Sequence, residues 1–238
     1  MSISPAKTPR LLVGLLVAGA LLLLCTLYAA FAIAPVERQM GIVQKIFYFH
    51  VPSANAMYLG FVVAAVSSAF YLGKRDARWD ALAVAGAEVG MLFCAAVLIS
   101  GPLWARKAWG VYWTWDPRLT TTLLGGMIFC AYLVLRSFAG IGEVEKRFAA
   151  GLAILGLLDL PIIKYSVQRW RGTHPTVISG RGGGIAPDMV PAFALGMTTF
   201  VVLAVCLIWL RYRAELLRQR LAATEVEAAR RGLLEGAA

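Results

Sequence analysis

The chain has 238 residues, of which 60% are hydrophobic and only 15% are charged, and its formal net charge is +10. A soluble domain is about half apolar and about a quarter charged, so this composition argues against an ordinary soluble protein. The basic excess would otherwise suggest nucleic acid, but most basic residues lie in short segments between apolar blocks, where they orient membrane proteins. The four cysteines lie inside apolar blocks without CxxC or CxxCH spacing, which argues against a c-type cytochrome or a common thiol-redox protein.

Six apolar blocks are long enough to cross a bilayer as helices of about 20 residues. They comprise residues 11–34, 53–72, 81–104, 117–138, 148–168 and 189–210. We therefore predict an all-α integral membrane protein with six transmembrane helices. The fifth block contains Asp159, Pro161 and Lys164, so we expect a kinked or short helix whose polar groups turn away from lipid.

Six spans place both ends of the chain on one side of the membrane. Lysine and arginine are modestly more numerous in the segments on that side, which predicts cytoplasmic termini. The basic residues of the outer segments then need another reason, and an anionic ligand would supply one. We divide the chain into a six-helix transmembrane domain, residues 1–210, and a charged, helix-prone cytoplasmic tail, residues 211–238.

The first outer segment, residues 35–52, is not a polar loop. Its apolar residues and its histidine share one helical face: Met40, Val43, Phe47 and His50. Arg38 and Lys45 lie on the opposite face of the same helix. This pattern predicts a short helix that lies along the membrane interface and ends at His50.

The second outer segment, residues 103–118, contains four of the seven tryptophans. Its aromatic cluster consists of Trp109, Tyr112, Trp113 and Trp115. Such a cluster can form a flat apolar surface suited to a planar macrocycle, although single tryptophans also anchor proteins at membrane interfaces. Trp109 and Trp113 share a face if the segment is helical, whereas Trp113 and Trp115 share one if it is extended.

The chain has two histidines, and both belong to outer segments. His50 lies in FYFHVP and His174 lies in RGTHP. A single histidine is usually a hydrogen-bonded polar residue, but two on one membrane face favour a ligand role. Imidazole is an axial ligand of haem iron, so the pair could approach one iron from both sides. Alternatively, one histidine binds while a partner protein supplies the other ligand.

Asp116 and Pro117 predict the start of the fourth helix, because aspartate is a favoured N-cap and proline a favoured first residue. Arg118 then lies in the first turn, next to the headgroup region. Arg118 and Lys45 are candidates to neutralise two haem propionates, or else they anchor to lipid headgroups.

The segment WGVYWTWDPRLT resembles the haem exporter protein C family of the bacterial cytochrome c maturation system. The residues that match the family's tryptophan-rich motif are Trp109, Gly110, Trp113, Trp115, Asp116, Arg118, Leu119 and Thr120. His50 and His174 occupy the places of the family's two outward-facing histidines. The resemblance covers residues 11–210, whereas nothing familiar matches the tail after Arg220, and Lys45 stands where an arginine is expected.

The resemblance implies that the protein binds haem b transiently, as cargo, on the periplasmic face of the bacterial inner membrane. It implies that the haem lies between the tryptophan-rich loop and the two histidines, which act as axial ligands. The implied partners are a periplasmic haem chaperone that receives the haem, a small single-span subunit, and the membrane subunit and ATPase of an ABC-type transporter. The chain would then be a haem-transfer protein without catalytic residues.

Three other functions are compatible with parts of the pattern. A haem lyase would present haem directly to apocytochrome c, although this chain is small for holding both. A membrane b-type electron carrier would place histidines inside its spans, and these spans contain none. An ion or solute transporter would need more intramembrane charge than Glu88, Asp159 and Lys164 provide.

Overall fold

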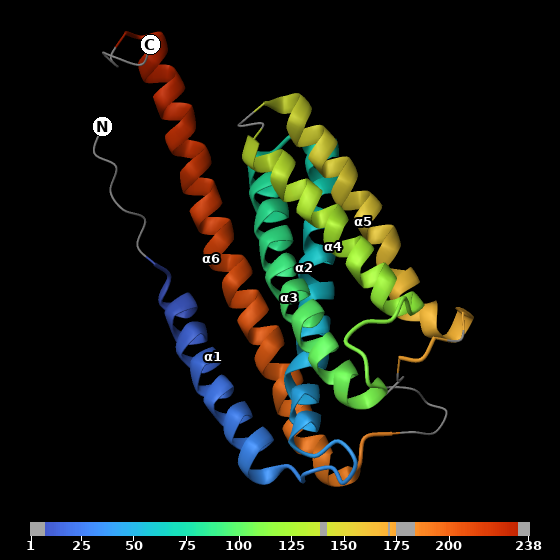
Figure 1. Cartoon of the computed structure of the whole chain (residues 1–238). Coiled ribbons are helices and arrows are strands. Elements are labelled where there is room, and N and C mark those ends of the chain that lie inside the picture. The colour runs from blue at the N-terminus through green and yellow to red at the C-terminus, as the bar shows by residue number, and fades with distance from the viewer. Residues whose placement is uncertain (1–7, 139–141, 171, 175–183, 233–238) are drawn as a thin grey trace.

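The computed structural model describes residues 8–138, 142–170, 172–174 and 184–232, and this part of the chain contains no β-strand. Six helices in it are long and apolar enough to cross a membrane, which confirms the predicted fold class. They are α1 Arg10–Tyr28, α2 Phe47–Lys74, α3 Ala77–Trp109, α4 Pro117–Phe138, α5 Glu143–Trp170 and α6 Val190–Arg230 (Figure 1).

The two ends of the bundle carry different segments. The terminal end, as we call it, contains the turn between α2 and α3, the start of α5 and the last part of α6. The site end contains the starts of α2, α4 and α6 and the ends of α3 and α5, and it lies at the bottom of Figure 1. The described parts of the three segments predicted to face outward therefore lie at the site end, whereas residues 171 and 175–183 of the third are outside the described residues.

Most helices extend beyond the blocks predicted from hydropathy. The predicted interfacial helix corresponds to a short 3₁₀ helix, Ile42–Ile46, which continues directly into α2. His50 therefore lies in the first turn of α2 and not at the end of a separate helix. The fifth span is not short, because α5 has 28 residues and continues through Pro161. The Lys164 side chain is exposed. Asp159 is buried, as expected.

Glycines bring α2 and α3 into close contact. A β-carbon added to Gly60 of α2 would lie 2.5 Å from the backbone of Gly90 and 2.8 Å from the carbonyl oxygen of Gly86, both on α3. Small residues of this kind allow membrane helices to approach closely. Close approach matters because the hydrophobic effect does not drive helices together in lipid, so dispersion contacts must stabilise the pair. The pair α2–α3 is thus closely packed, and it carries His50 and Trp109 at the site end.

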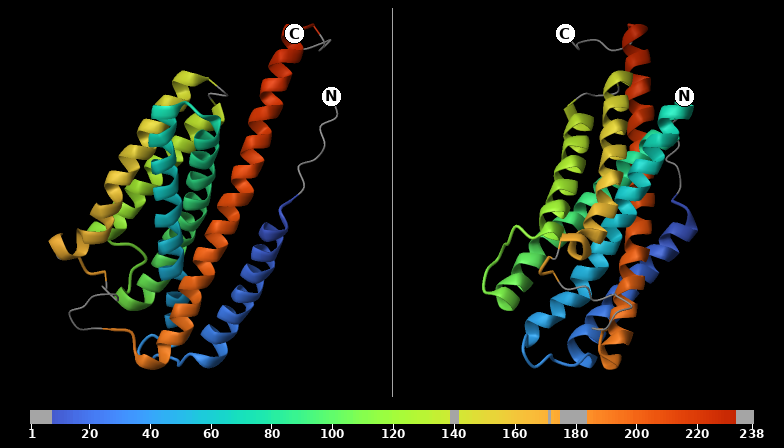
Figure 2. Two further views of the ribbon diagram at one scale, coloured as in Figure 1. Left: turned by 180° about the vertical axis from the view of Figure 1, so that it is seen from behind. Right: turned by 90° about the vertical axis from the view of Figure 1, so that its right-hand side faces the viewer.

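Aromatic packing joins this pair to α4 and α5. The rings of Phe61 on α2 and Phe129 on α4 stack in parallel, with their centroids 3.8 Å apart, and both residues are fully buried. Gly156 of α5 leaves the space for Phe129, because a β-carbon there would lie 2.5 Å from its ring. The main core cluster contains buried residues from all five helices α2 to α6, while α1 packs against α6 (Figure 2).

Buried charges join the helices at the terminal end. Arg136 of α4 donates to Asp80 of α3 at 2.8 Å, and Gln219 of α6 donates to the same carboxylate at 2.9 Å. Glu215 of α6 is 3% exposed and forms an ion pair with Arg218 at 2.6 Å. The first part of the predicted tail is therefore packed against the bundle as a direct continuation of α6.

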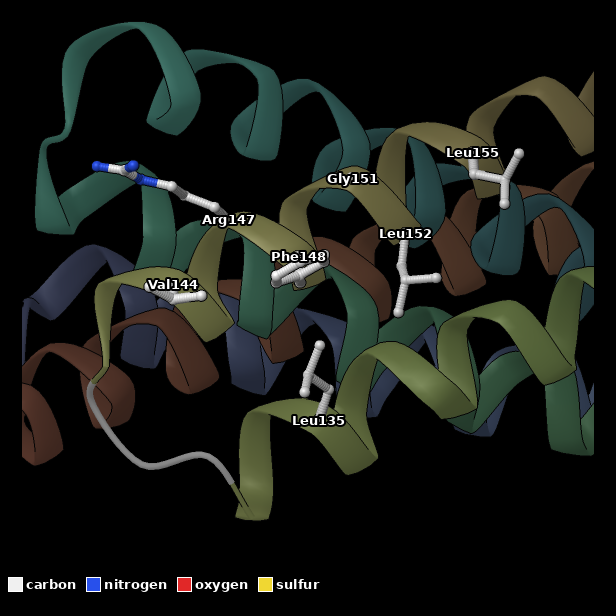
Figure 3. A pocket seen from close by; sticks show the side chains of 7 residues that line it. All are labelled: Leu135, Val144, Arg147, Phe148, Gly151, Leu152 and Leu155. Carbon is white, nitrogen blue, oxygen red and sulfur yellow. The ribbon is translucent and has the colours of Figure 1, made fainter.

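A groove opens between α4 and α5 at the terminal end (Figure 3). Its lining is apolar except for one arginine: Leu135, Val144, Arg147, Phe148, Gly151, Leu152 and Leu155. Because these helices are of membrane-spanning type, such a wall is suited to lipid contact. It lies at the end opposite the two histidines, so it contributes nothing to the candidate site.

Candidate functional site

The candidate site is formed by four segments at the site end (Figure 2). His50 comes from the first turn of α2, Trp109 ends α3, and Arg118 lies in the first turn of α4. His174 follows the end of α5. The structure thus brings together residues that are up to 124 positions apart in the printed sequence.

The tryptophan-rich loop begins where α3 stops. Gly110 adopts a left-handed conformation with φ 78°, and its N–H donates to the carbonyl oxygen of Arg106 at 3.2 Å. Only glycine adopts this conformation without strain, which explains its position after the last helical residue. The Arg106 guanidinium contacts the Gly110 carbonyl oxygen and lies 5.7 Å from the centroid of the Tyr112 ring. Tyr112 is thereby held near the end of α3, and its ring is exposed.

Asp116 both caps α4 and fastens the segment that carries His174. Its Oδ1 accepts from the backbone N–H of Arg118 at 2.9 Å, which is the N-cap bond predicted from the sequence. Its Oδ2 accepts from the backbone N–H of Thr173 at 2.6 Å, from the Thr173 hydroxyl at 3.2 Å and from the backbone N–H of His174 at 3.3 Å. The tryptophan-rich loop and the second histidine are therefore joined through one carboxylate.

The environment of Asp116 favours its charged form. Burial by itself raises the pKa of this carboxyl, but hydrogen bonds from the Arg118, Thr173 and His174 N–H groups and from the Thr173 hydroxyl outweigh it and lower the pKa. Gly172 allows this approach, because a β-carbon there would lie 2.6 Å from Asp116 Oδ2. The carboxylate is 6% exposed and remains an acceptor at neutral pH.

His174 is held by a cation and an indole. Its Nδ1 lies 3.3 Å from an Arg118 nitrogen, and its ring centroid lies 6.4 Å from that of Trp109. A guanidinium has donors and no acceptor, so Nδ1 must accept and the imidazole proton lies on Nε2. Arg118 also donates to the carbonyl oxygen of Lys164 at 3.0 Å, which holds the guanidinium between α4 and α5.

His50 faces α3. Its Nδ1 lies 2.8 Å from the hydroxyl of Ser100, and a β-carbon on Gly101 would lie 3.2 Å from its Cε1. Both histidines of the chain therefore lie at the same end of the bundle.

The aromatic cluster does not form a single flat surface. Trp113 and Trp115 have centroids 5.8 Å apart with planes at 82°, as expected for neighbours on one side of an extended segment. Trp109 instead packs edge-on against Trp104 at 5.5 Å. Trp115 is 76% exposed, which leaves its indole available to a ligand. Near-perpendicular pairs are a favourable geometry for aromatic rings, and this accounts for the arrangement.

Several buried polar atoms around this loop have no hydrogen-bond partner among the described residues. They are Trp113 Nε1, Thr114 Oγ1, Arg118 Nε and Thr120 Oγ1. A shallow hollow, lined by Thr114, Trp115, Asp116, Pro117, Gly172 and Thr173, adjoins them. Unpaired buried donors are costly, so their grouping here fits a ligand that carries acceptor oxygens, such as carboxylates.

Lys45 is not brought into this site. It is 2% exposed, and its ammonium donates to the backbone carbonyls of Ala34 and Pro35, the latter at 3.1 Å. The last carbonyls of a helix lack partners within the helix, and here the lysine supplies donors for the carbonyls that follow α1. The structure therefore places Lys45 as a support for the connection between α1 and α2.

Three residues of the site were missed by the sequence interpretation: Ser100, Gly172 and Thr173. Ser100 lies inside an apolar block, where a serine is easily read as a small helical residue. Gly172 and Thr173 precede His174 directly, so their proximity to a candidate ligand was the available signal. Their shared partner, Asp116, is more than fifty positions away in the chain and could not be identified from spacing.

Comparisons with known proteins identify the family of the chain. A family model described as "Heme exporter protein C" matches residues 4–227, which extends past the region of resemblance seen in the sequence and into the tail. The chain is 34% identical to a "Heme exporter protein C" of Bradyrhizobium diazoefficiens, over 95% of this chain and 86% of that protein. It is 30% identical to the protein of the same name from Rhodobacter capsulatus, over 91% and 90% of the two chains. It is also 32% identical to a mitochondrial cytochrome c biosynthesis protein of Marchantia polymorpha, over 73% and 75%. The chain belongs to the Heme exporter protein C family.

Proposed function

We propose that the protein binds haem b as cargo at the site end and delivers it to a periplasmic haem chaperone for cytochrome c maturation. The observation that carries the proposal is the single carboxylate of Asp116, which ties the tryptophan-rich loop to His174. The names of the relatives, which refer to haem export and to cytochrome c biosynthesis, support the class of cargo and pathway.

The residues present fit the three chemical demands of a haem: ligands for its iron, an aromatic surface for its porphyrin and positive charge for its propionates. His50 and His174 supply imidazoles for the iron, and the exposed Trp115 with Trp113 supplies aromatic surface for the porphyrin. Arg118 carries the charge that a propionate requires, and the unpaired donors of Thr114 and Trp113 are additional partners for its oxygens. Because the Trp115 indole is exposed, a haem bound against it could also be released to a partner.

We place the site end in the periplasm and the terminal end in the cytoplasm of a bacterial inner membrane. The exposed basic residues Lys74, Arg75, Arg78 and Arg147 lie at the terminal end, as expected for cytoplasmic flanks. A cysteine introduced at the exposed Val111 should react with an impermeant maleimide in spheroplasts, whereas one at Arg78 should react only after lysis. The reverse labelling pattern would refute this orientation.

We further propose that the chain acts as a transfer protein and not as an enzyme. In this scheme the chaperone takes the haem covalently on its own histidine. A small single-span subunit and an ABC-type transporter, with its membrane subunit and ATPase, work beside this chain and promote release. The competing function, a haem lyase, predicts covalent attachment of haem to apocytochrome c in a reconstitution that contains no chaperone.

The direct test is the absorption spectrum of the purified protein in detergent, with and without its histidines. We expect the loaded protein to show a six-coordinate, low-spin Soret band, and His50→Ala and His174→Ala each to lose it and to transfer less haem. Trp209→Ala, at an indole on α6 outside the site, is a control for nonspecific damage. Unchanged spectra and undiminished transfer in both histidine variants would refute the proposal.

A further inference from the structure

A serine on α3 has the geometry of a positioning group for the first histidine. Ser100 Oγ lies 2.8 Å from His50 Nδ1 and 2.6 Å from the backbone carbonyl oxygen of Ala96, one turn earlier in α3. Both distances are within the normal range for hydrogen bonds that involve a hydroxyl. The hydroxyl therefore connects the imidazole of α2 to the backbone of the neighbouring helix.

The direction of these two bonds follows from the number of available hydrogens. A serine hydroxyl has one hydrogen and can accept through its lone pairs, whereas a backbone carbonyl can only accept. The bond to Ala96 therefore uses the hydroxyl hydrogen, and the bond to His50 must be donated by Nδ1–H. A neutral imidazole carries one proton, so Nε2 of His50 is left with its lone pair.

The neighbouring backbone restricts the imidazole further. Gly101 follows Ser100, and a β-carbon there would lie 3.2 Å from His50 Cε1, which is closer than ordinary contacts. Among the described residues, Nε2 of His50 has no hydrogen-bond partner. Contacts with α3 thus hold the His50 imidazole on its Nδ1 side and leave Nε2 without a partner among the described residues.

We propose that Ser100 positions His50 as an iron ligand by holding it in the tautomer whose Nε2 can bind the metal. The inference rests on the proposed haem-binding function and adds a residue to it. Partners that orient a ligating histidine typically contribute about 10- to 100-fold to metal affinity. Ser100 itself would not touch the haem.

The test uses full-length protein in detergent, titrated with haemin and followed in the Soret region. We expect Ser100→Ala to weaken haem binding by about tenfold and to convert part of the low-spin spectrum to a five-coordinate form. Ser100→Thr keeps a hydroxyl at the same position and should restore the wild-type spectrum. Ser166→Ala is the matched control, because Ser166 is buried and its hydroxyl donates to the Ile163 carbonyl oxygen of its own helix at 2.9 Å.

A second variant set separates positioning from folding. In His50→Gly, free imidazole should enter the vacated space and restore a six-coordinate spectrum. Adding Ser100→Ala to His50→Gly should weaken this rescue by about tenfold, because the exogenous ring loses its acceptor. Equal rescue in both backgrounds would overturn the proposal.

The outcomes distinguish this inference from the proposed function. If His50→Ala abolishes the low-spin spectrum while Ser100→Ala leaves both affinity and spectrum unchanged, the role of Ser100 is refuted and haem binding stands. If neither His50→Ala nor His174→Ala alters the spectrum, the ligand assignment itself is refuted.

Discussion

Replacing Asp116 with asparagine should release the second histidine without removing any ligand. Asparagine has one side-chain oxygen, so it can accept from the Arg118 N–H or from the Thr173 and His174 N–H groups, but not from both sets. In the wild-type protein separate oxygens serve these sets, at 2.9 Å for Arg118 and at 2.6 and 3.3 Å for the other two. The variant must therefore leave one set unpaired.

The magnitude follows from the bonds that are lost. A hydrogen bond to a charged group contributes about 1.5–3 kcal/mol, and the 3.3 Å bond is long enough to count for little. The free energy that holds the segment carrying His174 should thus fall by about 2–3 kcal/mol. If this detaches His174 from the haem, haem affinity should fall roughly 30- to 150-fold. Haemin titration of the purified protein measures this directly.

Asp76 offers a matched control at the opposite end of the bundle. It also caps a helix, accepting from the Arg78 N–H at 2.9 Å, but it joins no second segment among the described residues. Asp76→Asn should therefore leave haem affinity unchanged. Equal affinities for Asp116→Asn, Asp76→Asn and the wild type would refute the fastening role of Asp116.

The same carboxylate predicts a dependence on pH. The hydrogen bonds to Asp116 lower its pKa, so its contribution to stability is present above the ordinary value of about 3.9 and is lost as pH falls through the lowered pKa. The difference in melting temperature between the wild type and Asp116→Asn should be constant from pH 8 to pH 5 and shrink only below about pH 4. A difference that disappears near pH 6 would contradict this assignment.

Three further changes test the surrounding structure. Gly172→Ala should resemble Asp116→Asn in haem titration, because its β-carbon would lie 2.6 Å from Asp116 Oδ2; Gly151→Ala, at a position with open space around it, is its control. Trp113→Ala and Trp115→Ala should each weaken haem retention by about 0.5–1.5 kcal/mol beyond lost area, and full haem occupancy after purification of the double variant would contradict a binding role. Arg136→Ala should lower the free energy of unfolding by about 3 kcal/mol and leave the Soret band unchanged, because it removes the closest cation from the buried Asp80. Arg147→Ala, at an exposed position, should lower it little.

Local features of the site could be predicted from the sequence. The start of α4 at Pro117 and the capping role of Asp116 were both correct, because an N-cap bond joins residues only two positions apart. The number of spans was also correct, because hydropathy measures the stretch that must be apolar. The ends of α4 were also correct, but most other helix ends were not, since helices continue into charged sequence, as α6 does through Arg230.

Long-range partnerships could not be read from one sequence. Lys45 was a candidate to neutralise a propionate because of its charge, but in the structure its ammonium donates to two backbone carbonyls. Ser100 was overlooked because a hydroxyl inside an apolar block commonly bonds to its own helix, and here it does this as well. Only the packing of α2 on α3 reveals that the same oxygen meets His50.

The two histidines enter the site with opposite hydrogen-bonding roles. Nδ1 of His50 donates to Ser100, whereas Nδ1 of His174 accepts from Arg118, so the protons lie on different nitrogens of the two rings. Arg118 cannot hold His174 and a haem propionate with the same donor, and a carboxylate is the stronger partner. We therefore expect haem to draw Arg118 away from His174, so that His50 binds iron first and His174 second. Nitrogen-15 NMR of histidine-labelled protein without haem should show the proton on Nδ1 for His50 and on Nε2 for His174, and Arg118→Ala should change only the second; identical tautomers in the wild type would refute this order.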